Sequence, residues 1–126
     1  MGLVVPIVGI LLLAGCSVSP FNVLNDDQRV ELRDSSSEYQ QQALADLYVD
    51  EAEYRQSVDD WRQCVVESGA EPSEIVARGN ELSFDYSVQR DTETEVAMIN
   101  LKTDSCLTEY FDAIGRVWVS QGTELN

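Results

Sequence analysis

The sequence predicts a small α+β domain in the order helix, helix, β hairpin, helix, stapled by a disulfide and preceded by a signal peptide and a tether. Three observations predict this fold. Apolar residues recur at helical spacing in three stretches, they alternate with polar residues in one stretch, and two cysteines flank that alternating stretch. The 126 residues leave room for one such domain, which we expect over 35–122 with a short tail at 123–126.

An apolar run from Leu3 to Ala14 opens the chain. It is shorter than the roughly 20 residues of a membrane-spanning helix, but its length suits the core of a signal peptide. The run ends in the tetrapeptide Leu13-Ala14-Gly15-Cys16. The tetrapeptide resembles the lipobox of bacterial lipoproteins, although the usual Lys or Arg before the apolar run is missing. A buried strand or a short core helix that happens to end at a cysteine is the alternative.

The lipobox resemblance implies where the protein is located and how it is attached to the membrane. Residues 1–15 would be removed as a lipoprotein signal peptide, and Cys16 would carry the acyl chains that bind membrane lipid. Several chains give stable attachment, where one chain would be marginal. We therefore expect a protein of the cell envelope, on the outer face of the cell membrane, or on the periplasmic face in a host with an outer membrane. Residues 16–34 would be the lipidated cysteine and its tether, in which Asn25 and Gln28 have the spacing to cap a short helix.

Two cysteines remain once Cys16 is assigned to lipid. Cys64 and Cys106 are an even pair in a compartment where disulfides persist, so a bridge between them is expected. Two buried free thiols or a redox pair are the alternative, although the sequence has no Cys-x-x-Cys spacing.

The first two helices of the domain are predicted from their starts. Two sequences have the spacing of a capping box, Ser35-x-x-Glu38 and Asp50-x-x-Glu53. We expect the helices that follow over about 36–48 and about 51–68, because apolar residues recur there every three or four positions. Gly69 is the expected stop of the second helix.

The hairpin is predicted where the period changes to two. The apolar members of the alternation are Leu82, Phe84, Tyr86 and Val88. Glu74–Arg78 is the expected partner strand, and Gly79-Asn80 suits a tight turn between the two strands.

The last helix is expected from about Thr92 to about Ser120, with possible breaks at residues 102–104 and at Gly115. Its apolar residues cover a wider face than one small hairpin can bury. Phe111 and Trp118 are therefore candidates for an exposed interaction surface.

Over about two thirds of its length the chain is similar to a group of small actinobacterial lipoproteins of unknown function. The shared features are the lipobox, a helix ending in Cys-x-x-x-x-Gly at Cys64 and Gly69, a strand of alternating aromatic and polar residues, and a later helix with the second cysteine. The resemblance implies the disulfide and the order of elements, and it implies no activity.

Composition excludes several functions. The chain has no histidine, which removes imidazole catalysis and histidine zinc sites. Eight basic residues against 23 acidic ones give a net charge of −15, so nucleic acid is not an expected partner. Carboxylates are the abundant reactive group, and the acids considered for a hydrolytic pair are Asp50, Glu51, Glu53, Asp59, Asp60, Glu81 and Asp85. None has a diagnostic spacing, and the acids at 91–95 suit a helix start better than a calcium site.

The sequence therefore predicts a membrane-anchored envelope lipoprotein that works as a non-enzymatic protein-interaction or inhibitory module. We expect no catalytic residue, no metal and no cofactor, and we expect a partner in the envelope. The alternative is a small envelope hydrolase or ligand carrier that uses a carboxylate site. A concave apolar pocket with two converging carboxylates of shifted pKa would favour this alternative, and a convex surface with an exposed Trp118 would count against it.

Overall fold

The computed structural model describes residue 2 and residues 23–126, so Cys16 and the expected signal peptide, apart from Gly2, lie outside the described residues. The predicted α+β class is confirmed. The elements are α1 (Asp26–Asp34), α2 (Glu38–Ala43), α3 (Glu51–Glu67), β1 (Glu71–Pro72), β2 (Val76–Arg78), β3 (Glu81–Ser83), β4 (Tyr86–Ser87), α4 (Glu93–Tyr110) and α5 (Asp112–Gln121).

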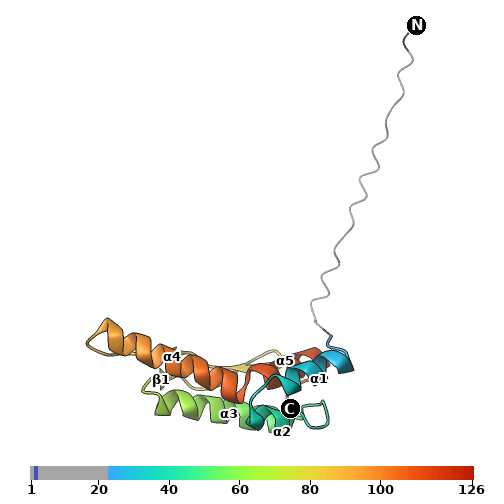
Figure 1. The fold of residues 1–126 in the computed structure, drawn as a ribbon, viewed down its shortest axis with the longest axis horizontal. Helices are drawn as coiled ribbons and strands as arrows, with labels where there is room; N and C mark the ends of the chain where they lie inside the picture. Colours follow the sequence, from blue (N-terminus) through green and yellow to red (C-terminus); the bar gives the residue numbers. More distant parts are fainter. Residues whose placement is uncertain (1, 3–22) are drawn as a thin grey trace.

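The two long helices α3 and α4 lie side by side along the long axis of the molecule, and α1, α2 and α5 gather at one end (Figure 1). The core lies between these helices and the strands. Its most deeply buried side chains are Leu44, Tyr54, Val58, Val65, Cys106, Ile114, Val117 and Trp118.

The helix α3 begins and ends as its sequence predicts. The Asp50 carboxylate accepts a hydrogen bond from the Glu53 N–H, and the Glu53 carboxylate accepts one from the Asp50 N–H. At the other end Gly69 has a φ of +101°, and Ala70 N–H donates to the Val65 carbonyl. This arrangement is a Schellman motif, which needs a left-handed residue at the glycine position.

The predicted disulfide between Cys64 and Cys106 is present and joins α3 to α4. The two Cα atoms lie 5.7 Å apart, and 42 positions separate the cysteines in the sequence. Closing a loop of that length lowers the entropy of the unfolded chain, which stabilises the fold by about 4 kcal/mol in the chain-entropy treatment. For a domain this small the bridge is a large part of the stability.

The strands confirm the expected turn and correct the expected lengths. β2 and β3 pair antiparallel around Gly79-Asn80, with Ala77 opposite Leu82. The single long strand expected from Leu82 onward is instead two short strands, because β4 turns away from β3 to pair with β1. Leu82 and Phe84 are buried as the alternation predicts, whereas Tyr86 is exposed.

The start of α2 differs from the prediction. Its N-cap is Ser37, whose side chain accepts from the Gln40 N–H. Ser35 ends the preceding helix α1 instead, and its hydroxyl donates to the Glu31 carbonyl. The helix is also shorter than expected and ends at Ala43, before the positive φ of Leu47.

The last predicted helix is two helices, and the break falls at Phe111 rather than at residues 102–104 or Gly115. The break leaves carbonyls at the end of α4 and N–H groups at the start of α5 without partners in their own helix. Side chains from α2 and α3 satisfy them. The Gln40 amide donates to the Thr108 carbonyl at 2.7 Å and accepts from the N–H groups of Ala113 and Ile114.

Two serines complete this arrangement. The Ser37 hydroxyl donates to the Glu109 carbonyl, and the Ser57 hydroxyl donates to the Tyr110 carbonyl. Three consecutive carbonyls of α4 therefore bind side chains from other elements. These contacts let the chain turn at Phe111 without leaving buried backbone groups unpaired.

The part of the expected tether that the structure describes contains the helix α1. The capping box expected at Asn25 and Gln28 is confirmed. The helix packs on α2 and α5, and its Leu32 contacts the core. The end of the tether segment therefore belongs to the folded domain.

Candidate functional site

A groove of about 800 Å³ lies beside the helix α5, and we name it the α1/α5 groove. Its apolar lining residues are Leu24, Leu32, Leu107, Phe111, Gly115 and Val119. Its polar lining residues are Gln28, Glu31, Ser35, Glu81, Asp112 and Arg116. A concave surface with an apolar lining and a few polar groups is the usual form of a binding site.

The helix α5 forms the floor of the groove. Its contribution comes from one face, since Asp112, Gly115, Arg116 and Val119 are spaced by three, one and three residues. The opposite face of the same helix, which carries Trp118, is buried in the core. The helix is thus fixed on its inner side and open on its outer side.

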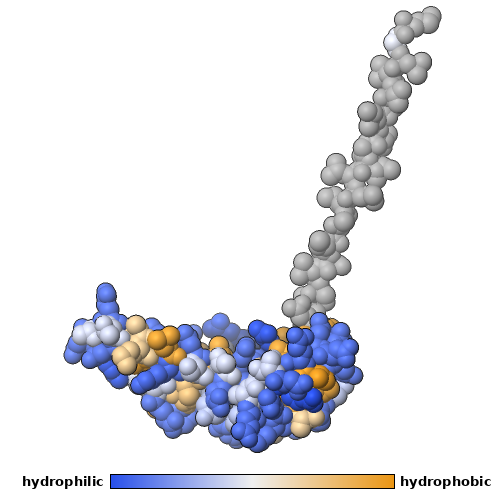
Figure 2. All heavy atoms as spheres, in the orientation of Figure 1, coloured by the Kyte–Doolittle hydropathy of each residue, from blue (hydrophilic) through white to orange (hydrophobic). Residues whose placement is uncertain are grey.

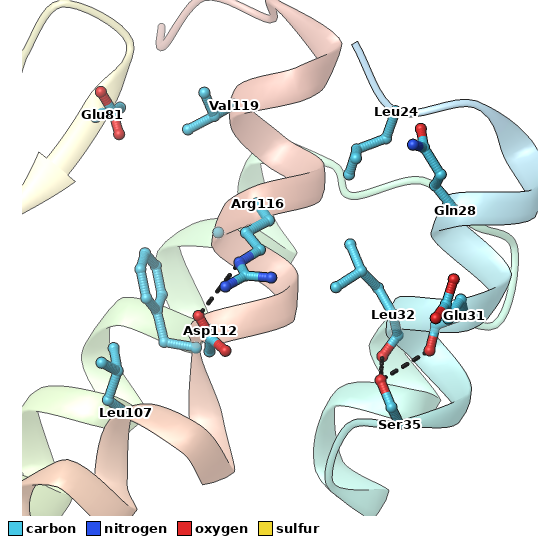
Figure 3. Close-up of a pocket in the computed structure, with 12 residues that line it drawn as sticks. Leu24, Gln28, Glu31, Leu32, Ser35, Glu81, Leu107, Asp112, Arg116 and Val119 are labelled. Atoms are coloured by element: carbon cyan, nitrogen blue, oxygen red, sulfur yellow. Dashed lines mark hydrogen bonds and ion pairs between the residues drawn. The ribbon is translucent and has the colours of Figure 1, made fainter. Parts of the chain in front are cut away.

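The walls come from elements far apart in the sequence. On one side Leu24 and Leu32 point from α1 and the segment before it toward α5, and on the other side Glu81 lies on β3 (Figure 3). Leu107, near the end of α4, lines the groove next to the start of α5 and is 36% exposed. The groove therefore exists only in the folded domain.

Gly115 lets the ring of Phe111 lie against α5. A Cβ atom at position 115 would come within 2.7 Å of two atoms of that ring. The ring also stacks on Trp61, with 4.7 Å between the ring centroids. Phe111 was expected on an interaction surface, and the structure places it, half-buried, in the lining of the groove.

Trp118 corrects the other half of that expectation. The side chain is 0% exposed, stacks on Tyr54 with 4.5 Å between ring centroids, and donates its indole N–H to the Asn80 carbonyl at 2.7 Å. The expectation of a surface role is wrong because α5 turns this side chain into the core. Tyr54 of α3 and the turn between β2 and β3 cover it there, so more than the hairpin alone packs on the apolar face of the last helix.

The charge of the groove is negative. Arg116 is the one cation among its twelve lining residues, and its Nε atom lies 3.5 Å from Asp112 Oδ1. Glu31 and Glu81 form no ion pair with any residue of the described chain. The apolar residues of the groove thus lie between carboxylates on both walls.

The carboxylates considered for a hydrolytic pair do not meet in the α1/α5 groove, and the two that do lie together form a helix cap. Asp50 and Glu53 cap α3, and Asp60 accepts from the Tyr39 hydroxyl. Asp59 lines a shallow hollow of about 450 Å³ with Arg62 and Glu74. Of these candidates only Glu81 lines the α1/α5 groove.

The groups with a shifted pKa have structural causes. Hydrogen bonds from the Asn126 backbone and from Arg55 lower the pKa of Glu51. Burial raises the pKa of Glu53, which also lies beside Asp50. Burial and the neighbouring Asp60 carboxylate raise the pKa of Tyr39, and burial raises that of Tyr54. These four groups lie outside the groove.

The acids near residue 93 start a helix, as expected. Thr92 is the N-cap of α4 and accepts from the Glu95 N–H, with Glu93 and Glu95 in the first turn. Within residues 23–126 no three His, Cys, Asp or Glu side chains are placed to hold a metal ion. In the same part of the chain no helix is both long and apolar enough to cross a bilayer.

Comparisons of the chain with protein-family models, with curated proteins and with solved structures find no match.

Sequence reasoning missed the α1 wall and the role of Gly115. A signal for the wall was present, because Gln28 and Leu32 are spaced by four residues on one side of the capped helix, and Leu24 comes directly before its N-cap. Gly115 carried no comparable signal, since a glycine in a helix indicates a break as readily as a close contact.

Proposed function

We propose that the chain is a lipid-anchored protein of the bacterial cell envelope that acts as a non-enzymatic protein-interaction or inhibitory module. The α1/α5 groove, in which apolar residues lie between two acidic walls, is the observation that supports the interaction role. A surface of that kind binds a partner through apolar burial and uses its charges for selection.

The anchor in this proposal is acylated Cys16, on the outer face of the cell membrane or on the periplasmic face where a second membrane is present. Because Leu24 and α1 are part of the domain, the tether would extend only from Cys16 to Val23. A stretch that short spans at most about 30 Å, at about 3.4 Å per residue. The groove begins at Leu24, so a partner would be bound close to the membrane surface.

The anchor is tested by the intact mass of the protein from its native membrane fraction. We expect a chain that begins at acylated Cys16 and gains two hydrogen atoms when the disulfide is reduced. A soluble chain of unprocessed mass would contradict both the anchor and the envelope location.

The interaction is tested by photo-crosslinking in the native cells. A photoreactive amino acid replaces Leu107, which lines the groove, or Leu101, which is 68% exposed on the same helix and lies outside the groove. A third variant carries the photoreactive amino acid at Gln28, on the α1 wall of the groove. We expect one partner protein to be cross-linked from positions 107 and 28 but not from position 101. Equal cross-linking from all three positions, or none from any, would contradict the proposal.

A second candidate is a small-molecule carrier that uses the same groove. The volume of about 800 Å³ favours it, since it lies within the range of about 300 to 1,000 Å³ typical of small-molecule pockets. Native mass spectrometry of the purified full chain would show a bound molecule that a Leu107→Asn variant loses.

A further inference from the structure

We propose that a basic amphipathic helix of the partner protein occupies the α1/α5 groove. This helix lies along α5, and its apolar face contacts the groove. This inference rests on the proposed interaction function and names the chemistry of its partner.

The shape of the groove favours a helix. Its floor is the outer face of α5, which has 10 residues and is therefore about 15 Å long. Its walls are mainly α1 and the end of α4, whose backbone groups are largely bonded within the helices and give an extended strand few partners. A helix of two to three turns fits such a floor and is recognised through its side chains, in the helix-in-groove mode.

The apolar part of the groove supplies the anchor points. Leu32 stands on one side of the floor, and Leu107 and Phe111 stand on the other. Gly115 lets the Phe111 ring lie flat against α5, so the ring adds apolar surface to the middle of the floor. An apolar stripe on the partner would be buried against both sides at once.

The charges determine which amphipathic helix fits. Glu31 stands on the α1 wall and Glu81 on the opposite wall, while Asp112 on the floor is already paired with Arg116. A helix with Lys or Arg on both flanks places its cations over the two wall carboxylates. The net charge of −15 adds a long-range attraction for the same partner and repels an acidic one or a second copy of this chain.

The test uses the full-length protein and two labelled peptides of about 14 residues, which form helices of about 20 Å. Both peptides carry the same leucine stripe, one with lysines on its flanks and the other with glutamates. We expect fluorescence anisotropy to show that the lysine peptide binds at least tenfold more tightly, and that its affinity falls as NaCl is added.

Two pairs of variants locate the binding. Leu107→Asn removes a groove leucine and is expected to lower the affinity for the lysine peptide about tenfold. Leu101→Asn on the same helix is expected to leave this affinity unchanged. Glu31→Gln and Glu81→Gln are each expected to lower the affinity for the lysine peptide about threefold at low salt. Glu67→Gln, outside the groove, is expected to have no effect on it. The charge variants alter exposed side chains, so they test the groove even if the Leu107 variant is less stable.

Three results would overturn the inference. The two peptides could bind equally, the groove variants could match their controls, or an uncharged apolar dye could bind in a Leu107-dependent way where the lysine peptide does not. The last result would assign the groove to a small apolar ligand. Cross-linking of one protein in cells together with failure of the lysine peptide would keep the proposed function and reject only the basic helix.

Discussion

At the scale of single residues, Gly115 decides how the lining of the groove is built. A helix normally gains up to about 1 kcal/mol when glycine is replaced by alanine. Here the new methyl group would lie 2.7 Å from the Phe111 ring, and crowding in a packed site costs about 1–3 kcal/mol. We expect Gly115→Ala to lower the free energy of unfolding by about 1 kcal/mol and to change the fluorescence of Trp61, on which Phe111 stacks.

The second substitution needed to test this prediction is Phe111→Leu. A leucine takes the ring away from α5, so Gly115→Ala is expected to be neutral or stabilising in that background. A thermodynamic cycle measured by urea unfolding compares the two backgrounds. If Gly115→Ala stabilises the protein while Phe111 is present, the proposed close contact is wrong.

Tyr39 gives the fold a pH dependence at high pH. Burial first, and then the hydrogen bond and charge of Asp60, raise the pKa of its hydroxyl well above the usual value of about 10. Above that pH the unfolded chain loses the proton while the folded chain keeps it, so the free energy of unfolding falls as the pH rises. Below it the contribution is fully present.

We expect Tyr39→Phe to make the loss of stability above about pH 10 shallower. Asp60→Asn removes the carboxylate but leaves the burial, so its slope should lie between those of the wild type and Tyr39→Phe. Urea midpoints measured at a series of alkaline pH values give the three slopes. Identical slopes for all three proteins would exclude this role of Tyr39.

At the scale of elements, Gln40 holds the break between α4 and α5. Its side chain is fully buried and makes three hydrogen bonds to backbone groups of the two helix ends. Gln40→Leu keeps the size but leaves those groups unpaired, at a cost of about 1–3 kcal/mol for each buried group. We expect the free energy of unfolding to fall by about 3 kcal/mol in total.

The control for this prediction is Gln42→Leu, because Gln42 is exposed on the same helix. Its effect should stay within about 0.5 kcal/mol. Urea unfolding with the disulfide intact measures both variants. Equal losses would mean that the break is held by packing alone.

The same element shows what a sequence can and cannot predict. The starts of α1 and α3 and the turn at Gly79-Asn80 were predicted because each depends on residues within three positions of one another. The break at Phe111 depends on Gln40, about 70 positions away, and no local pattern contains that information. The burial of Trp118 depends in the same way on Tyr54 and Asn80, which are far from it in the sequence.

The candidate site was predicted in part for the same reason. Phe111 was selected from the wide apolar face of the last helix, and it does line the groove. The sequence places Leu32 in the tether, because residues 16–34 lie between the expected lipidated cysteine and the expected domain. Its role depends on packing against α5, which is a property of the folded domain.

At the scale of the whole molecule, the surface carries far more negative than positive charge. The face seen in Figure 2 is largely hydrophilic, with apolar residues gathered near α1 and along α4. The four ion pairs within the described residues are all local, between positions no more than four apart. Such pairs contribute little, so the net charge of −15 mainly produces repulsion within the folded chain.

Salt should therefore act in opposite directions on the fold and on the complex. Raising NaCl from about 0.02 to 0.5 M shortens the screening length from roughly 20 Å to about 4 Å, which weakens repulsion among exposed acids. We expect the urea midpoint of the free protein to rise over this range. The affinity for the lysine peptide should fall, because the same screening weakens the attraction between the peptide and the wall carboxylates.

A neutral osmolyte such as sucrose is the control, since it should raise the urea midpoint without lowering the affinity for the lysine peptide. A midpoint that falls with NaCl would mean that ion pairs outweigh repulsion. An affinity independent of NaCl would mean that the groove selects its partner by apolar burial alone.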